Sequence, residues 1–275
     1  MRTRGEQIVA EQIPAELRRF RTAAPHYLAG RPAYAPRLIR LVARLTGLSG
    51  NDRALDLGCG PGMLAGAFAT LAGEVIAMDP EPEMLRIATT EFGGAGRIRF
   101  VRGSSDDLAP ELGRFHLVTM GRSFHWMDRL ETLRRLDGMI EPGGTVALFD
   151  SDHLDVPDNA WNAEYRALVR GYAEDDWTHW RQRDDTRLGH AAILLGSPFS
   201  ALDTVSVIER RQVTVTQLVD RAFSRSSTAP QRLGAAAPKL AAEIAALLRP
   251  LATDGVLTEV VATSALLARR PGAEP

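Results

Sequence analysis

The chain has 275 residues, of which 45% are hydrophobic and 24% charged, so it is long enough for one large domain with an ordinary core. Its formal net charge of −1 argues against a general surface for nucleic acid or anionic membrane. The single cysteine, Cys59, excludes an internal disulfide framework. No apolar run of membrane-spanning length and no secretion signal are evident, so we expect a cytoplasmic protein.

The first part of the chain predicts two helices joined by an ordered loop. Residues 1–24 have apolar positions at helical spacing, and residues 36–48 form a second amphipathic pattern. Between them, the segment 27–36 contains two prolines, which break helices, together with Tyr27 and Arg31. This loop is either a hinge between the helices or a flap whose side chains face a ligand.

A short apolar strand at 54–57 leads into a glycine-rich turn and then into a helix. Gly58, Gly60 and Gly62 stand at alternate positions, which allows unusual backbone conformations and close approach of a ligand to the helix N-terminus. The dinucleotide fingerprint G-x-G-x-x-G would need glycine at the position of Met63. The pattern therefore predicts a nucleotide-like ligand but disfavours a dinucleotide.

The next strand, 74–79, is apolar and ends in Asp79. An acid at the end of the second strand, about 20 residues after the first glycine, is placed to accept hydrogen bonds from both ribose hydroxyls. Taken alone, an aspartate after a strand more often caps a helix. Its distance from Gly58 favours the ribose role.

A second informative stretch follows the fourth predicted strand. The segment 97–102 predicts the third strand, and 115–120 predicts the fourth, which ends at Gly121. His125 and Trp126 come directly afterwards, at the crevice where open α/β sheets bind ligands. A histidine beside a tryptophan is by itself more typical of packing than of catalysis, but this position makes His125 a candidate site residue.

The rest of the chain predicts a fifth strand, a helical insertion and a return to the sheet. His153 leaves the fifth strand at the same edge and is a rival base. Residues 154–198 depart from the sheet pattern and predict a helical lid, whose aromatic residues either face a substrate or pack the insertion onto the core. They include Trp161, Trp177 and Trp180. Farther on, Arg225 is either a surface loop residue or an anion contact.

These motifs resemble, in order, those of class I S-adenosylmethionine (SAM) dependent methyltransferases. The resemblance covers residues 27–150 and includes Y-x-x-x-R-P-x-Y, G-x-G-x-G, the acid after the second strand, H-W-x-D and P-G-G. It implies an α/β fold with a doubly wound, seven-stranded, mostly parallel sheet of the Rossmann-like methyltransferase type. The implied division is a helical N-terminal cap (1–48), a SAM-binding core (49–153), a helical lid (154–198) and the C-terminal part of the core sheet (199–270).

The resemblance also implies an activity: transfer of a methyl group from SAM to an O, N or C atom of a small-molecule metabolite. The near-neutral charge disfavours a nucleic-acid or membrane partner, the histidine spacing disfavours a metal site, and we expect a monomer or homodimer. The alternatives are a catalytically silent SAM-fold binding or regulatory protein and a nicotinamide-dependent oxidoreductase.

Site roles follow from the same resemblance. Ser105 would donate its backbone N–H to adenine and Asp106 would accept from the exocyclic amine, with Asp107 as the competing position. His125 would be the base, with His153 behind it, and Asp128 would cap the next helix. The implied cofactor residues are Tyr27, Arg31, Asp56, Gly58, Gly60, Gly62, Asp79, Ser105, Asp106 and Gly121. The candidate substrate residues are Trp126 and, from the aromatic composition of the predicted lid, Trp161, Trp177 and Trp180.

Overall fold

The computed structural model describes residues 22–173 and 188–272. The strands are β1 (Arg53–Leu57), β2 (Glu74–Asp79), β3 (Ile98–Arg102), β4 (Phe115–Gly121), β5 (Ile140–His153), β6 (Ala201–Thr214) and β7 (Val256–Arg269). The helices are α1 (Ala24–Gly30), α2 (Pro36–Thr46), α3 (Met63–Phe68), α4 (Pro82–Phe92), α5 (Arg129–Asp137), α6 (Trp161–Tyr172), α7 (His190–Leu195), α8 (Val215–Phe223), α9 (Pro230–Leu233) and α10 (Ala237–Leu248).

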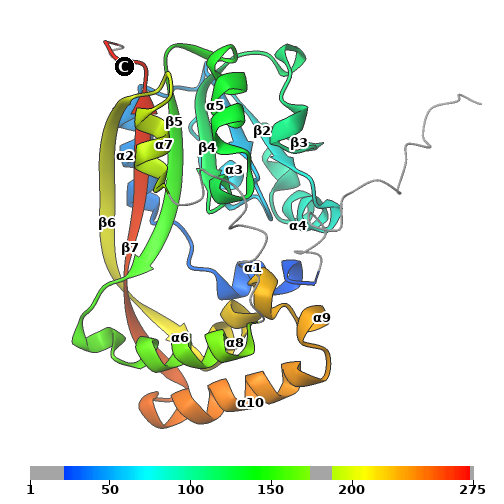
Figure 1. The fold of residues 1–275 in the computed structure, drawn as a ribbon, viewed down its shortest axis with the longest axis vertical. Helices are drawn as coiled ribbons and strands as arrows, with labels where there is room; N and C mark the ends of the chain where they lie inside the picture. Colours follow the sequence, from blue (N-terminus) through cyan, green and yellow to red (C-terminus); the bar gives the residue numbers. More distant parts are fainter. Residues whose placement is uncertain (1–21, 174–187, 273–275) are drawn as a thin grey trace, which may run out of the picture.

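The described part of the chain forms one seven-stranded sheet in the order β3-β2-β1-β4-β5-β7-β6 (Figure 1). The pairs from β3 to β5 are all parallel, whereas β7 runs antiparallel to both β5 and β6. The order reverses between β1 and β4, which is where open α/β sheets bind ligands. The predicted fold class, a doubly wound and mostly parallel seven-stranded sheet, is confirmed.

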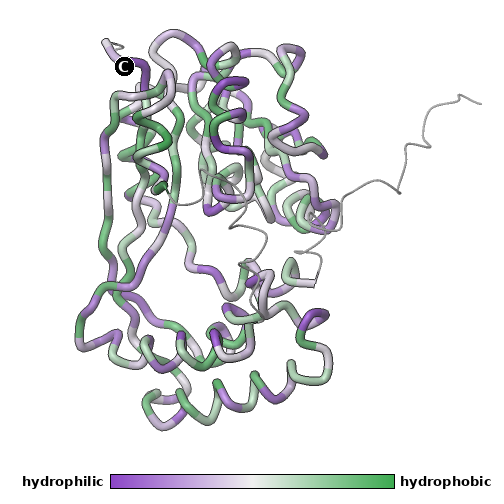
Figure 2. Tube along the Cα trace, viewed as in Figure 1, coloured by the Kyte–Doolittle hydropathy of each residue, from purple (hydrophilic) through white to green (hydrophobic). Residues whose placement is uncertain are grey.

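Alternate residues of the inner strands face two different cores. In β1, Ala54 belongs to the core formed with α2 and α3, while Leu55 and Leu57 belong to the core formed with α5 and α7. Burial on both faces explains why the parallel strands are continuous apolar runs in the sequence. In Figure 2 the strands of the sheet carry long green, hydrophobic stretches.

A third core lies beyond the main sheet, where the long strands β6 and β7 continue into a layer of helices (Figure 1). We call α1, α6, α8, α9 and α10 the helical layer. Tyr165 of α6, Leu218 of α8 and Leu240 of α10 are completely or almost completely buried in this core. Thus α6, from the predicted lid, packs with helices from the following segment 199–270. The division into a lid and a C-terminal part of the core stays a prediction.

Two element boundaries differ from the sequence prediction. The segment 27–36 was expected to be all loop, but α1 continues to Gly30, because the prolines of this segment, Pro32 and Pro36, both lie beyond the end of the helix. Strand β5 was expected over 145–150 and is much longer. The predicted helix at 1–24 lies largely outside the described residues.

Gly30 ends α1 at a close contact between two backbones. A Cβ atom at this position would lie 2.3 Å from the backbone nitrogen of Arg221 in α8. Only glycine allows this approach, which docks the start of the 31–35 loop onto the helical layer. Within residues 22–173 and 188–272, no helix has the length and apolar character needed to cross a membrane.

Candidate functional site

The glycine-rich turn connects β1 to α3 at the reversal point of the sheet. Gly58, Gly60 and Gly62 have φ angles of +69°, +54° and +83°, which side chains other than glycine rarely adopt. The backbone N–H groups of Gly58 and Cys59 both donate to the Met78 carbonyl, at 2.8 and 2.9 Å. A Cβ atom built at Gly60 would meet nothing within 4 Å, so the turn opens onto free space there.

Asp79, at the end of β2, is hydrogen-bonded directly to this turn. Its Oδ2 accepts from the Gly60 N–H at 2.8 Å, and its Oδ1 accepts from the Glu81 N–H at 2.9 Å. Burial raises the pKa of Asp79 to about 6 despite these two hydrogen bonds. Each carboxylate oxygen has a second lone pair. The carboxylate is therefore oriented beside the open end of the glycine turn and retains the capacity to accept from a ligand.

Asp56 is more deeply buried than Asp79 and connects the secondary-structure elements around the site. Its Oδ2 accepts from the backbone N–H of Ala65 in α3 at 2.9 Å, and its Oδ1 accepts from the Thr119 hydroxyl of β4 at 3.0 Å. Burial raises the pKa of Asp56 to about 7, although both hydrogen bonds oppose that shift. These contacts hold α3 against the two central strands. A direct contact of Asp56 with a ligand stays a prediction.

The turn after β3 separates the two aspartates that compete for one role. The Asp107 carboxylate accepts from the backbone N–H of Ser104 at 2.7 Å and from its hydroxyl at 3.0 Å. Asp107 thereby closes a capping box around a short 3₁₀ helix, Ser105–Asp107. Ser105 is buried and Asp106 is exposed. This geometry favours Asp106 over Asp107 as the residue available to a ligand.

His125 lies in a short 3₁₀ helix, Phe124–Trp126, just after β4. Its ring centroid is 5.1 Å from that of Trp126 and 6.4 Å from that of His190. Part of the residue reaches solvent, but the protein crowded around it lowers the pKa to about 4, and the positive charges of His190 and Arg31 add to this effect. The imidazole is therefore neutral near pH 7, the form that accepts a proton.

Asp128 and Gly121 lie on either side of this segment. The Asp128 carboxylate accepts from the Glu131 N–H at 3.1 Å, so its predicted role as a helix cap is confirmed. Gly121 ends β4 against the hydroxyl of Tyr34, which would lie 2.6 Å from a Cβ at this position. The glycine brings Tyr34 into close contact with the end of β4.

A cluster of arginine and tyrosine side chains lies beside this end of β4. The Arg122 guanidinium lies over the rings of Tyr27 and Tyr34, at 5.8 and 4.9 Å from their centroids, and Arg31 lies 5.3 Å from the centroid of Tyr27. Such stacking stabilises cations in partly dry surroundings. Arg122 was not predicted as a site residue, and its φ of +56° is one that its residue type does not suggest.

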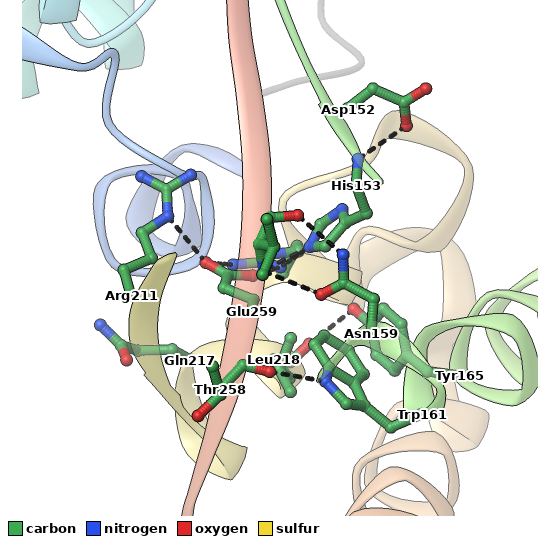
Figure 3. A network of polar contacts seen from close by, with 12 residues as sticks. Asp152, His153, Asn159, Trp161, Tyr165, Arg211, Gln217, Leu218, Thr258 and Glu259 are labelled. Atoms are coloured by element: carbon green, nitrogen blue, oxygen red, sulfur yellow. Dashed lines mark hydrogen bonds and ion pairs between the residues drawn. The ribbon is translucent and has the colours of Figure 1, made fainter. Parts of the chain in front are cut away.

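His153 belongs to a different polar network, which is centred on Glu259 of β7 (Figure 3). Glu259 is only 2% exposed and accepts from His153 Nε2 at 2.9 Å, from Arg221 at 2.7 and 3.3 Å, and from Arg211 at 3.1 Å. Burial alone would raise the pKa of Glu259, but these partners lower it to about 2. Because Glu259 holds one ring nitrogen of His153, this histidine is part of a structural network, and its role as a base stays a prediction.

The same network ties the 31–35 loop to the helical layer. Arg221 donates to the Gly30 carbonyl at 2.8 Å, and Arg211 donates to the Ala33 carbonyl at 3.1 Å. Both arginines are in turn held by Glu259. Arg211, Arg221 and Glu259 were not predicted as site residues, because their partners lie far along the chain. Glu259 therefore positions the 31–35 loop, which contains Tyr34.

The predicted substrate tryptophans are divided between different places. Trp126 is half-buried beside His125. Trp161 is 6% exposed within the third core, where its indole N–H donates to the Thr258 carbonyl at 2.9 Å. Its surroundings agree with the packing alternative. Trp177 and Trp180 lie outside the described residues.

Residues 54–144 match the model of a family described as a methyltransferase domain. This range contains the glycine turn, Asp79 and His125. The matched range covers β1 to the start of β5.

Curated proteins that resemble the chain include a ubiquinone biosynthesis O-methyltransferase of Xanthomonas campestris, 36% identical over 123 residues. The match covers 43% of this chain and 51% of that protein, so the chain spans about half of that relative's length. An uncharacterized methyltransferase of Mycobacterium tuberculosis (strain ATCC 25618 / H37Rv) is 25% identical over 209 residues, covering 75% of this chain and 76% of that protein.

Solved structures resemble the fold over most of the chain. A putative type II methyltransferase from Anaeromyxobacter dehalogenans has a TM-score of 0.62 at 22% identity, covering 87% of this chain and 97% of the other. A SAM-dependent methyltransferase from Geobacter sulfurreducens, in complex with S-adenosyl-L-homocysteine, has a TM-score of 0.51 at 16% identity, covering 94% and 98%. At these identities the likeness concerns the fold.

Proposed function

We propose that the protein transfers a methyl group from SAM to an O, N or C atom of a small molecule. The observation that carries this proposal is the hydrogen bond between Asp79 and the Gly60 N–H at the reversal point of the sheet. It brings the carboxylate that we expect to bind ribose next to a glycine turn with open space. The methyltransferase domain match and the bound S-adenosyl-L-homocysteine of the Geobacter sulfurreducens relative support the choice of ligand.

The described side chains fit the chemistry of SAM. Asp79 has free lone pairs for the ribose hydroxyls, and the open side of Gly60 leaves room for the methionine part. Arg31 has a buried Nε that makes no hydrogen bond and is suited to the SAM carboxylate. Ser105 and Asp106 lie after β3, where the adenine would be read. Tyr27 lies against Arg31 and would close the site from the side of α1.

The work of the protein in this reaction is mostly positioning. Bound SAM supplies a methyl group that its sulfonium already activates. Asp79 and the glycine turn hold the nucleoside in one orientation, and Arg31 with Tyr27 fixes the other end, so that an acceptor approaches along a defined line. Alignment of reacting groups can contribute several kcal/mol to a rate. Trp126 would provide a wall next to the acceptor.

His125 is the proposed base where the acceptor must lose a proton. Its lowered pKa keeps the imidazole neutral over the physiological range, so it accepts a proton at pH 7 without prior deprotonation. A pKa of about 4 also makes it a weak base. It therefore suits an acceptor whose proton is released as the new bond forms, and general-base assistance of this kind contributes about 10²–10⁴-fold.

The test is transfer of label from [methyl-³H]SAM to a fractionated extract of small metabolites. We expect label in a small-molecule fraction with the wild type and a loss of at least tenfold with Asp79→Asn at limiting SAM. The matched control is Asp203→Asn, which removes an exposed ion pair with Arg269. If SAM binds but no fraction is labelled, the protein is a silent SAM-fold binding protein and the proposed activity is wrong.

A further inference from the structure

Two half-buried arginines, Arg31 and Arg225, lie close enough for their charges to interact. Arg31 donates from Nη2 to the carbonyl of Ser224 at 3.3 Å, and Ser224 is the chain neighbour of Arg225. The Nε atoms of both Arg31 and Arg225 are inaccessible to solvent and have no hydrogen-bond partner. Among residues 22–173 and 188–272, no carboxylate forms an ion pair with either side chain.

The backbone around Arg225 is fixed rather than free. The Ser224 hydroxyl donates to the Arg221 carbonyl at 2.8 Å, and the Thr228 hydroxyl donates to the Ala222 carbonyl at 2.6 Å. Both Ser224 and Thr228 are completely buried. Arg225 therefore extends from a well-packed corner at the end of α8, next to the close contact of Gly30 with Arg221.

The charge of this region is not balanced. Burial lowers the pKa of Arg31 to about 10, and the positive charges of Arg122 and Arg225 contribute to that decrease. Burial also lowers the pKa of Arg225, to which the charges of Arg166 and Arg221 add. SAM brings one carboxylate, one ammonium and one sulfonium, so its binding would add a net positive charge. The carboxylate of SAM can satisfy Arg31 but leaves Arg225 uncompensated.

We propose that Arg225 binds an oxyanion group of the methyl acceptor, a carboxylate or a phosphate ester. The Nε and Nη edge of a guanidinium forms two parallel hydrogen bonds with such a group, which also fixes its orientation. The contact of Arg31 with Ser224 brings this subsite next to the proposed cofactor site. This inference rests on the proposed function and extends it to the class of acceptor. It also favours the second of the two sequence-based interpretations of Arg225.

The experiment uses the full chain saturated with S-adenosyl-L-homocysteine, so that the cofactor's own carboxylate subsite is filled. The complex is titrated calorimetrically with phenylacetate, with phenyl phosphate and with the neutral isostere phenylacetamide. We expect at least one anion to bind about 10–100-fold more tightly than the amide, which is the range for hydrogen bonds to charged groups. The two anions distinguish a carboxylate subsite from a phosphate subsite.

Variants then assign the preference to one side chain. Arg225→Gln should abolish the preference for the anion while the affinity for S-adenosyl-L-homocysteine stays within about twofold. Arg225→Lys keeps the charge without the planar fork and should retain part of the preference. The control is Arg249→Gln, an exposed arginine after α10, which should change nothing. Thermal unfolding of each variant checks that it is folded.

Three results would overturn the proposal: no anion binding at tens of millimolar, equal binding of anion and amide, or an undiminished preference in Arg225→Gln. Failure of the proposed function looks different. In that case S-adenosyl-L-homocysteine does not bind to the wild type, and the same three probes are titrated into the protein without it. An anion preference lost in Arg225→Gln would then support the subsite on its own.

Discussion

Replacement of Glu259 by glutamine removes the negative charge at the centre of the network in Figure 3 while nearly preserving the shape of the side chain. Glu259 is 2% exposed and faces Arg221, Arg211 and His153. Its partners lower its pKa from the ordinary 4.5 to about 2. Since one pKa unit corresponds to about 1.4 kcal/mol, the charged network contributes about 3 kcal/mol to the free energy of unfolding at pH 7.

The contribution of Glu259 to the unfolding free energy depends on pH. The folded-state pKa lies below the unfolded-state value, so the contribution is complete above pH 4.5 and is lost as the pH falls toward 2. Breaking a buried ion pair from one side typically costs about 3–5 kcal/mol, in agreement with this estimate. We therefore expect Glu259→Gln to lower the unfolding free energy by about 3 kcal/mol at pH 7, and by less as the pH falls below 4.5.

The assay is urea unfolding followed by circular dichroism at pH 7, 4 and 3. The matched control is Glu243→Gln, which removes a surface pair with Lys239 on α10 and should cost less than about 1 kcal/mol. A change below about 1 kcal/mol for Glu259→Gln at pH 7, or a difference from the wild type that grows as the pH falls, would refute the reasoning.

Three further outcomes follow from the site. Gly121→Ala places a Cβ 2.6 Å from the Tyr34 hydroxyl and should cost about 1–3 kcal/mol in unfolding free energy, whereas Gly171→Ala, in α6 with no atom within 4 Å, should cost nothing; equal effects in thermal melts would contradict this. His125→Asn should lower the single-turnover methylation rate about 10²–10⁴-fold and leave the dissociation constant of SAM within twofold; an unchanged rate removes His125 as the base. SAM affinity should rise as the pH increases through about 6, because the ribose hydroxyls donate to the ionised form of Asp79; an Asp79→Asn variant that keeps this rise would refute the assignment.

Local patterns allowed the sheet and the first half of the site to be predicted. The apolar runs of β1 and β2, the glycine turn and Asp79 are signals within about 25 residues of one another, and each corresponds to one physical requirement. The positive φ angles at Gly58, Gly60 and Gly62 and the hydrogen bond from Gly60 to Asp79 agree with that interpretation.

Contacts between residues far apart in the chain could not be predicted from the sequence. Glu259 is hydrogen-bonded to His153, which is 106 residues away in the sequence, and Arg221 is hydrogen-bonded to Gly30, which is 191 residues away. A single buried glutamate in a strand carries no pattern that identifies its partners. For the same reason, the packing of α6 with α8 and α10 was not predicted, because hydrophobic periodicity shows which face of a helix is buried but not what covers it.

The central claim is that the glycine turn and Asp79 bind SAM, and calorimetric titration tests it most directly. SAM and NADH are titrated into the wild type, Asp79→Ala and the control Asp203→Asn. We predict binding of SAM and none of NADH, a loss of SAM affinity of about 100-fold in Asp79→Ala, as two charge-assisted hydrogen bonds are removed, and an unchanged affinity in the control. Binding of NADH in place of SAM, or equal SAM affinity in the wild type and Asp79→Ala, would contradict the account.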